Sequence, residues 1–278
     1  MIPLRCGRIS YTNDLPLFAA FDEGVLDYPG TLHSDVPTRL NTMLVSGELD
    51  LGPISALAFA KHADRLTPVG DLCIGAHDEV LSVILVSRTP PTALGGAPIA
   101  VTDESASGAG LLRVLLERRY GVFAQYQRSA DPLARARAGE PALLIGDHAI
   151  DARFTFAREN IYDLGRLWRE WTGEQTVFAV WAARKDIALE RAEEVDACVR
   201  AMMAARAWGR SHLGRVAALA QHVSPRPAGF YESYYAALTF TLDPDAQRGL
   251  SRYWRELVAI GEIDRVPELA LETSGVAS

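Results

Sequence analysis

Several features that define common protein classes are missing from this chain. Its 278 residues include three cysteines, Cys6, Cys73 and Cys198, whose wide spacing fits neither a disulfide framework nor a metal knuckle, so we expect three buried thiols. No apolar stretch approaches the roughly 20 residues that a membrane helix needs, and the first residues lack the apolar core of a signal peptide. We therefore expect a cytoplasmic protein that does not enter a membrane.

Basic runs and the common catalytic motifs are missing as well. The net charge is -7, with no long basic run, which argues against non-specific binding of nucleic acids. The chain has no P-loop, no G-x-G-x-x-G turn and no G-x-S-x-G elbow, and its six histidines form no metal-type pair. We therefore predict neither cofactor nor metal, and a small-molecule ligand that is held by local dipoles and a few side chains.

What the chain does contain is a regular alternation of strand-like and helix-like segments. Residues 4–9 are predicted as a strand, and residues 15–23 and 37–46 as helices, the second of which ends at Gly47. Ser55 is placed to cap the helix that follows it. Such alternation predicts an α/β fold with a mainly parallel sheet that is covered on both faces.

The punctuation of the chain predicts two lobes. Dense proline and glycine at 88–96 are typical of a boundary, and two similar apolar strands, 82–88 and 178–184, bracket the segment between them. An inserted lobe that is entered and left through adjacent strands would form a hinged, two-lobed clamp. The predicted lobes are 1–88 plus 185–278 for the first, discontinuous lobe and 89–184 for the inserted second lobe.

The C-terminal third has a different pattern. From residue 187 to about 263 the periodicity is helical, with one long helix at 189–209. We expect this helical segment to pack on the first lobe. The tail at 269–278 carries little pattern, which is typical of a mobile terminus.

Polar residues and glycine follow the predicted strands at the points where those strands end. Ligands of open α/β sheets bind at these carboxyl ends, and helix starts there offer N–H groups and a partial positive charge to an anion. The residues so placed are Asn13, Ser55, Thr102, Ser105, Ser107, Gly146 and Asp147. Each polar side chain among them has a structural alternative, which is to cap its own helix. Together the turns predict a clamp for a small polar anion.

Other residues near these turns carry weaker signals. His77 and His148 lie in turns from which they could reach a cleft, although a solvated or structural histidine is the more common case. Phe178 and Trp181 lie on one predicted strand, where aromatic residues are usually part of the core. The alternative for both rings is to line the cleft against a ligand.

The same turns carry a resemblance that extends from Arg5 to about Tyr253. The segments are GRISYTNDLP (7–16), GELDLGPIS (47–55), VTDESAS (101–107), LLIGD (143–147), YDLGRLWREWTG (162–173) and FAVW (178–181). In combination they resemble the chorismate dehydratases of the futalosine route to menaquinone. The resemblance implies a periplasmic-binding-protein type II fold and the dehydration of chorismate to an enolpyruvyl benzoate without a cofactor.

The resemblance also implies roles for individual residues. Asn13 matches the family turn and Ser82 the family serine on the crossover strand, so these two are the expected catalytic residues. The expected substrate-binding residues are Ser55, Thr102, Ser105, Ser107, Gly146, Asp147, Phe178 and Trp181. The chain departs from the family at Ala56, where relatives often have a second serine, and at Phe59, where a tyrosine often stands. One hydroxyl contact that relatives can make at this helix therefore has no counterpart in this chain.

Two other functions are compatible with the sequence. The sister enzyme, 1,4-dihydroxy-6-naphthoate synthase, shares the fold, but its family typically opens with a Ser-Pro-Cys-Pro-Asn-Asp turn where this chain has Ser-Tyr-Thr-Asn-Asp at 10–14. A cytosolic protein that binds a small carboxylate without a reaction is the other alternative. The sequence offers no strong general base, which leads to the hypothesis that a substrate carboxylate takes the proton. It does not fix the oligomeric state.

Overall fold

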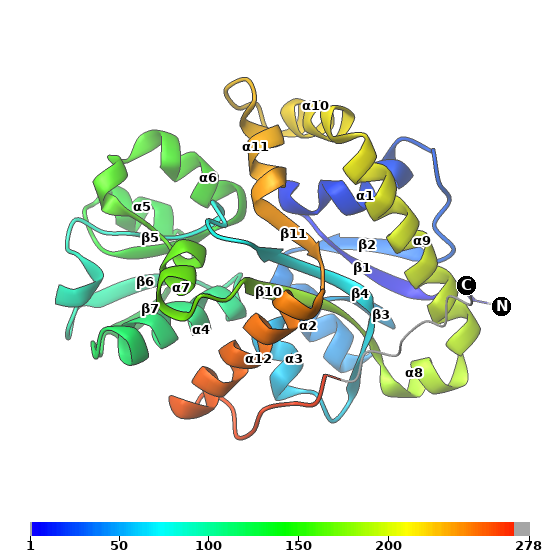
Figure 1. Cartoon of the computed structure of the whole chain (residues 1–278), viewed down its shortest axis with the longest axis horizontal. Coiled ribbons are helices and arrows are strands. Elements are labelled where there is room, and N and C mark those ends of the chain that lie inside the picture. Colours follow the sequence, from blue (N-terminus) through cyan, green and yellow to red (C-terminus); the bar gives the residue numbers. More distant parts are fainter. Residues whose placement is uncertain (1, 270–278) are drawn as a thin grey trace. The chain divides into compact units, whose positions relative to one another are not determined.

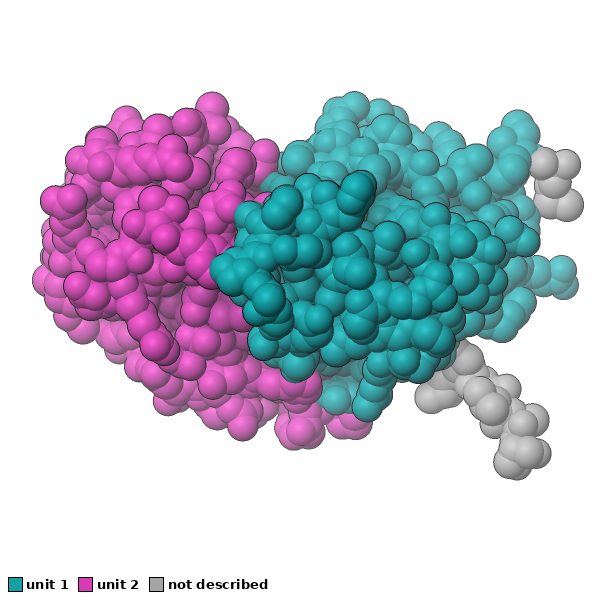
Figure 2. Space-filling view, turned by 90° about the horizontal axis from the view of Figure 1, so that it is seen from above, with its two compact units in different colours: residues 1–74, 179–243, 267–278 teal, residues 75–178, 244–266 magenta. Residues whose placement is uncertain are grey.

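The computed structural model describes residues 2–269, so the tail predicted from 269 onward lies outside the described residues from position 270. The chain divides into two compact units (Figure 2). Unit 1 takes the residues up to 74, then 179–243, and those from 267 on, whereas unit 2 takes 75–178 and 244–266. Both units are therefore discontinuous in sequence.

Unit 1 is built on one six-stranded sheet (Figure 1). Its strands are β1 (Arg5–Ile9), β2 (Thr31–Asp35), β3 (Leu51–Ser55), β4 (Leu66–Ala76), β10 (Thr176–Arg184) and β11 (Leu238–Thr241). The order is β11-β4-β10-β3-β1-β2, and β1 pairs in parallel with both β2 and β3. Parallel pairing places the carboxyl ends of β1 and β3 at one edge of the sheet, and the segments that contain Asn13 and Ser55 start there.

The helices of unit 1 come from both ends of the chain. They are α1 (Leu15–Asp22), α2 (Pro37–Ser46), α3 (Ala56–Lys61), α8 (Lys185–Glu190), α9 (Ala192–Ser211), α10 (Leu213–Val223) and α11 (Phe230–Ala237). Helix α2 has the predicted bounds, because Pro37 fits the first helical position and Gly47 adopts the left-handed conformation that ends it. All three cysteines are buried free thiols, as predicted, and Cys6 and Cys198 lie on β1 and α9 of this unit.

Unit 2 has a five-stranded sheet of its own. The strands are β5 (Val83–Val86), β6 (Pro98–Thr102), β7 (Gln125–Ser129), β8 (Ala142–Ile145) and β9 (Ile161–Asp163). They follow the order β7-β6-β8-β5-β9, with β6 parallel to β7 and β8, and β5 antiparallel to β8 and β9. The carboxyl ends of β6 and β8 therefore meet the start of β5 at one edge.

Helices surround this second sheet. They are α4 (Ala106–Val114), which continues as the π-helical turn η3 (Leu115–Arg119), then α5 (Pro132–Arg137), α6 (Gly146–Thr155), α7 (Leu164–Thr172) and α12 (Pro244–Ala259). Short 3-10 turns η2 (Pro91–Ala93) and η4 (Arg158–Asn160) complete the unit. Ile84, Val86, Ala142 and Leu144, from two neighbouring strands, belong to a cluster of buried apolar residues in this unit.

The structure differs from the predicted crossover at the first connection. The segment at 82–88 contains β5, which pairs with β8 on one side and β9 on the other within the sheet of unit 2. All four residues of β5 are buried. The chain passes between the units at 74/75, near the end of β4, and again at 178/179 within β10. The predicted lobe boundaries stood at 88/89 and 184/185.

The last helix also differs from the prediction that the whole helical segment packs on the first lobe. Helix α12 belongs to unit 2, where the Tyr253 hydroxyl donates a hydrogen bond of 3.0 Å to the carbonyl of Ser107. The Tyr253 ring also contacts Trp168 edge to face, with ring centres 6.2 Å apart. Helical periodicity predicts such a buried face but not the partner that covers it.

No helix in the described part of the chain, residues 2–269, combines the length and the apolar character needed to cross a membrane.

Candidate active site

The turn after β1 carries Asn13. This turn is one turn of 3-10 helix, η1 (Thr12–Asp14). Helix α11 holds it in place, because the Tyr235 hydroxyl donates a hydrogen bond to the carbonyl of Thr12 at 2.8 Å. Asn13 is half-buried, and its Oδ1 is buried with no hydrogen-bond partner among the residues that the structure describes. Because burial of an unpaired amide oxygen costs free energy, this atom is suited to accept a hydrogen bond from a ligand.

Ser55 has a clear structural role. Its Oγ accepts hydrogen bonds from the backbone N–H of Ala58 at 3.1 Å and from Asn41 Nδ2 at 3.2 Å. Asn41 Oδ1 in turn accepts from the Ser55 N–H at 2.9 Å. The predicted cap of α3 is thus confirmed, and because a serine hydroxyl also carries a proton of its own, capping does not prevent donation to a carboxylate.

The two aromatic residues of β10 differ in burial. Trp181 lies opposite Pro53 of the antiparallel strand β3 and is only 2% exposed, as expected for a core residue. Phe178 is half-buried and stands three residues earlier on the same strand. Phe178 therefore has more ring surface free for a ligand than Trp181.

In unit 2 the structure brings Ser82 next to Gly146. The Gly146 N–H donates a hydrogen bond of 2.8 Å to the carbonyl of Ser82, and the Ser82 Oγ donates to the carbonyl of Val80 at 3.3 Å. Gly146 is the first residue of α6 and has a φ of +56°, which favours glycine. No side chain caps α6, so the first turn of this helix presents its positive end next to Ser82.

The start of α4 lies close to the same place. Ser105 caps this helix, because its Oγ accepts from the Gly108 N–H at 3.0 Å, and a β-carbon on Gly108 would lie 3.2 Å from Val83. Thr102 Oγ1 accepts from the Glu104 N–H at 3.1 Å. Ser107 is buried, and its carbonyl accepts the Tyr253 hydroxyl. The hydroxyl groups of Thr102 and Ser105 thus first stabilise the turn, and the turn places a helix N-terminus beside β5.

Three remaining candidates are at least partly exposed. Asp147 lies half-buried in the first turn of α6, whereas His148, next to it, is exposed. His77 is also exposed, on the segment that follows β4. Across residues 2–269 the structure contains no cluster of three or more His, Cys, Asp or Glu side chains that could hold a metal ion.

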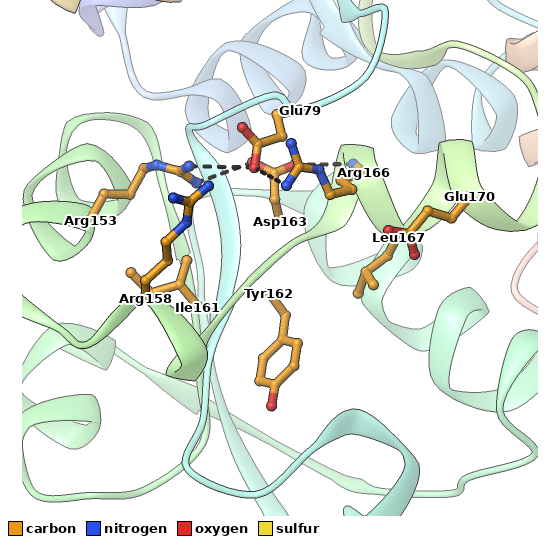
Figure 3. A pocket seen from close by; sticks show the side chains of 9 residues that line it. All are labelled: Glu79, Arg153, Arg158, Ile161, Tyr162, Asp163, Arg166, Leu167 and Glu170. Carbon is orange, nitrogen blue, oxygen red and sulfur yellow. Dashed lines mark hydrogen bonds and ion pairs between the residues drawn. The ribbon is translucent and has the colours of Figure 1, made fainter.

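A pocket on unit 2 contains residues to which the sequence assigned no function. It has a volume of about 370 Å³ and is lined by charged side chains around β9 and α7 (Figure 3). Its lining residues are Glu79, Arg153, Arg158, Ile161, Tyr162, Asp163, Arg166, Leu167 and Glu170. The acidic and basic side chains are partly paired, with Arg166 3.0 Å and Arg153 3.6 Å from Glu79.

The buried member of this group is Asp163, which is 5% exposed. It caps α7 and also accepts hydrogen bonds from the N–H groups of Val80 and Leu81. Burial raises the pKa of Asp163 above its ordinary value, although the hydrogen bonds from Val80, Leu81 and Arg166 and the charge of Arg153 act in the opposite direction. The segment YDLG at 162–165 was part of the resemblance, but no local pattern shows its contact with residues 80 and 81.

Known proteins resemble this chain over most of its length. Residues 4–259 match the sequence profile of a family described as menaquinone biosynthesis. The chain belongs to this family. The chain is also 32% identical over 232 residues to a chorismate dehydratase of Thermus thermophilus, a match that covers 78% of this chain and 81% of the relative.

Solved structures show the fold of this family member. Protein AF1704 from Archaeoglobus fulgidus superposes with a TM-score of 0.74 at 19% identity, over 94% of this chain and 98% of that one. The Candida albicans CA3427 gene product, described as having the generic periplasmic-binding-protein fold, gives a TM-score of 0.64 at 14% identity, over 99% of each chain. The α/β fold predicted from the alternation of strands and helices, and the periplasmic-binding-protein type implied by the resemblance, are thus confirmed.

Proposed function

We propose that the protein is a chorismate dehydratase, a carbon–oxygen lyase that converts chorismate into 3-[(1-carboxyvinyl)oxy]benzoate and water in menaquinone biosynthesis. The observation that carries this proposal is the 32% identity over 232 residues to the chorismate dehydratase of Thermus thermophilus. Membership of the menaquinone biosynthesis family across 4–259 supports it. The sister naphthoate synthase is not favoured by these matches.

The reaction explains why a site of hydroxyls, amides and helix ends is sufficient. The ring proton beside the enolpyruvyl ether leaves together with the neighbouring hydroxyl, and the two depart as one water. The ring becomes aromatic, so the product is strongly favoured. The protein must hold one conformer, assist the departing hydroxyl and exclude competing rearrangements.

Asn13 and Ser82 are the proposed catalytic residues. The unpaired Oδ1 of Asn13 would accept a hydrogen bond from the ring hydroxyl and orient it, while Nδ2 is a donor to a carboxylate. The hydrogen bond from the Ser82 Oγ to Val80 is long at 3.3 Å, so substrate can replace it without a large loss. The helix start at Gly146 beside Ser82 supplies positive potential for a carboxylate or for the developing negative charge.

The remaining candidates are proposed to bind the two carboxylates and the ring. Ser55, Thr102, Ser105 and Ser107 stand at or near helix starts, where hydroxyl and N–H donors combine. Phe178 offers a half-buried ring to the cyclohexadiene. That substrate binds between the lobes, and that the enzyme is cytoplasmic, stay predictions from the sequence.

The base is proposed to be a carboxylate of the substrate. Asp147, in the first turn of α6, is the side chain of this region that offers an alternative. An Asp147→Asn variant that keeps most of its activity supports the substrate carboxylate. If an analogue without the enolpyruvyl carboxylate is dehydrated at a near-normal rate, the hypothesis that this carboxylate is the base is refuted.

The test of the proposed function is direct. Purified protein is mixed with chorismate without added cofactor or metal, and the products are followed by chromatography and mass spectrometry. Loss of one water, with an aromatic absorption spectrum, is the expected result, and it should disappear when the protein is heat-denatured. Chorismate that stays unchanged in the presence of folded protein, or that binds without turnover, refutes the enzyme and favours a binding protein.

A further inference from the structure

The segment that leads into Ser82 is held by one buried carboxylate. Asp163 Oδ1 accepts the N–H of Val80 at 3.0 Å, and Oδ2 accepts the N–H of Leu81 at 2.8 Å. The same Oδ1 accepts the N–H groups of Gly165 at 3.0 Å and Arg166 at 3.2 Å, at the start of α7. Asp163 thus joins two segments that lie about eighty residues apart in the sequence.

Leu81 adopts a backbone conformation that leucine rarely takes. Its φ is +63°, and it is the single non-glycine residue with a positive φ in the described part of the chain. Leucine has no local side-chain hydrogen bond that would favour this conformation. Such a residue persists where the surroundings over-determine it, and such positions cluster at functional sites.

The neighbours of Asp163 reinforce this arrangement. A β-carbon on Gly165 would lie 2.5 Å from the carbonyl oxygen of Asp78 and 3.0 Å from the nitrogen of Val80, so the segment passes directly over the start of α7. Arg153 stands 3.4 Å from Asp163, and this cation offsets part of the cost of the buried negative charge. The aspartate and the glycine of YDLG at 162–165 therefore act on the same short segment.

The held segment ends at the proposed catalytic serine. Val80 provides the carbonyl that accepts the Ser82 Oγ, and the Ser82 carbonyl accepts the N–H of Gly146. A change at Leu81 would therefore move both the Ser82 hydroxyl and the Ser82 carbonyl that contacts the start of α6. We propose that Asp163 is a positioning residue of the dehydration, which holds Leu81 in its left-handed conformation and so fixes the backbone of Ser82 against the start of α6 and, with it, the Ser82 hydroxyl. This inference rests on the proposed function.

Asp163→Asn is the variant that tests the proposal. An asparagine keeps one acceptor oxygen for Val80, Gly165 and Arg166, but its NH₂ group cannot accept the N–H of Leu81. We expect kcat to fall roughly 10- to 100-fold, because an error of about 1 Å in a reacting group can cost that much, while KM changes much less. Asp131→Asn is the capping control, because Asp131, an exposed residue, caps α5 of the same unit through the N–H of Ala134.

A double variant separates positioning from a loss of stability. Glycine adopts a positive φ without strain, so Leu81→Gly in the Asp163→Asn background should restore kcat at least several-fold. Because a glycine at this strained position can also restore stability, kcat is referred to the folded fraction of each variant, measured by circular dichroism. Unchanged kcat in Asp163→Asn, or a loss of activity that matches the unfolded fraction and is not restored by Leu81→Gly, overturns the proposal.

Amide hydrogen exchange tests, without any substrate, whether Asp163 holds residues 80 and 81 in place. In the wild-type protein the amide of Leu81 should exchange slowly, and in Asp163→Asn it should exchange much faster while the helix α5 amides stay unchanged. Fast exchange of the Leu81 amide in the wild-type protein overturns the proposal that Asp163 holds this segment. If the wild-type protein leaves chorismate unchanged, the proposed function fails by that result, whereas the exchange data still decide whether Asp163 holds the segment.

Discussion

Two short segments, one that contains and one that precedes a candidate catalytic residue, are built in opposite ways. In the turn η1 of unit 1, the side-chain oxygen of Asn13 is buried without a partner in the described structure. In unit 2, the N–H groups of Val80 and Leu81, just before Ser82, both reach the carboxylate of Asp163. The first segment keeps an unused hydrogen-bonding group for a ligand, and the second uses its hydrogen bonds to hold a backbone in place. We therefore expect a substitution in the first segment to lower activity without lowering stability, and a substitution in the second to lower both.

The largest effect is expected for Asn13→Ala. Loss of a group that contacts the reacting atoms should lower kcat/KM by roughly 100- to 1000-fold. The free energy of unfolding should stay within about 0.5 kcal/mol of wild type or rise, because no intramolecular hydrogen bond to Oδ1 is lost. Steady-state kinetics and chemical denaturation measure the two quantities, and a variant that loses stability in proportion to activity would contradict the contrast.

Ser82→Ala sharpens the comparison from the side of unit 2. We expect kcat to fall roughly 10- to 100-fold, the effect of one hydrogen bond to a charged group. The control is Ser87→Ala, since Ser87 is a buried serine just past the other end of β5 whose Oγ donates to the carbonyl of Thr89 at 2.7 Å. Equal losses of kcat in the two variants would show that Ser82 has no special role.

Asn41→Ala is the structural counterpart of Asn13→Ala in unit 1. Both oxygen and nitrogen of the Asn41 amide are bonded to Ser55, so truncation leaves a buried N–H without its acceptor. We expect the free energy of unfolding to fall by about 1–3 kcal/mol, with a loss of kcat/KM well below that of Asn13→Ala. Denaturation curves of the two variants, recorded side by side, measure the difference. A stable Asn41→Ala protein would show that buried amides in this unit are interchangeable.

The smallest effect is expected from acid titration of Asp50. Burial raises the pKa of Asp50, but hydrogen bonds from the side chain and backbone of Arg5, with the charges of Arg5 and Arg184, outweigh burial and hold the pKa below its ordinary value. A lowered folded pKa stabilises the fold above the unfolded pKa of about 3.9, and this contribution is lost as pH falls through the folded pKa.

Asp50→Asn should therefore be less stable than wild type at pH 7, by about 1 kcal/mol because Arg5 is half exposed. The difference should shrink below about pH 4. Thermal denaturation across pH measures it, and a difference that is the same at acidic and neutral pH would contradict the assignment.

Local sequence signals predicted the parts of the fold that are set locally. Helix α2 begins and ends where Pro37 and Gly47 indicate, and Ser55 caps α3 as its position before the helix predicted. The long helix predicted at 189–209 is present as α9, but it begins at Ala192, because the short helix α8 ends at Glu190 and Arg191 separates the two. Arg191 leaves the helical conformation and donates to the carbonyl of Ile2, a contact that no local pattern reveals.

The same limit applies to the candidate site. Strand ends and helix starts directed attention to Asn13 and Ser82, because polar residues at those points are a local feature. Asp163 was missed as a functional residue, since its contacts with Val80 and Leu81 join positions more than eighty residues apart. From the sequence, Asp163 is only a good cap for α7.

The discontinuity of both units has a consequence for synthesis on the ribosome. Unit 2 receives its last helix, α12, only after the second part of unit 1 has been made. Until then the buried ring of Trp168 and the carbonyl of Ser107 lack the cover of Tyr253. Unit 2 therefore stays incomplete during synthesis until α12 has been made. A product truncated at residue 243 should be prone to aggregation and to capture by chaperones.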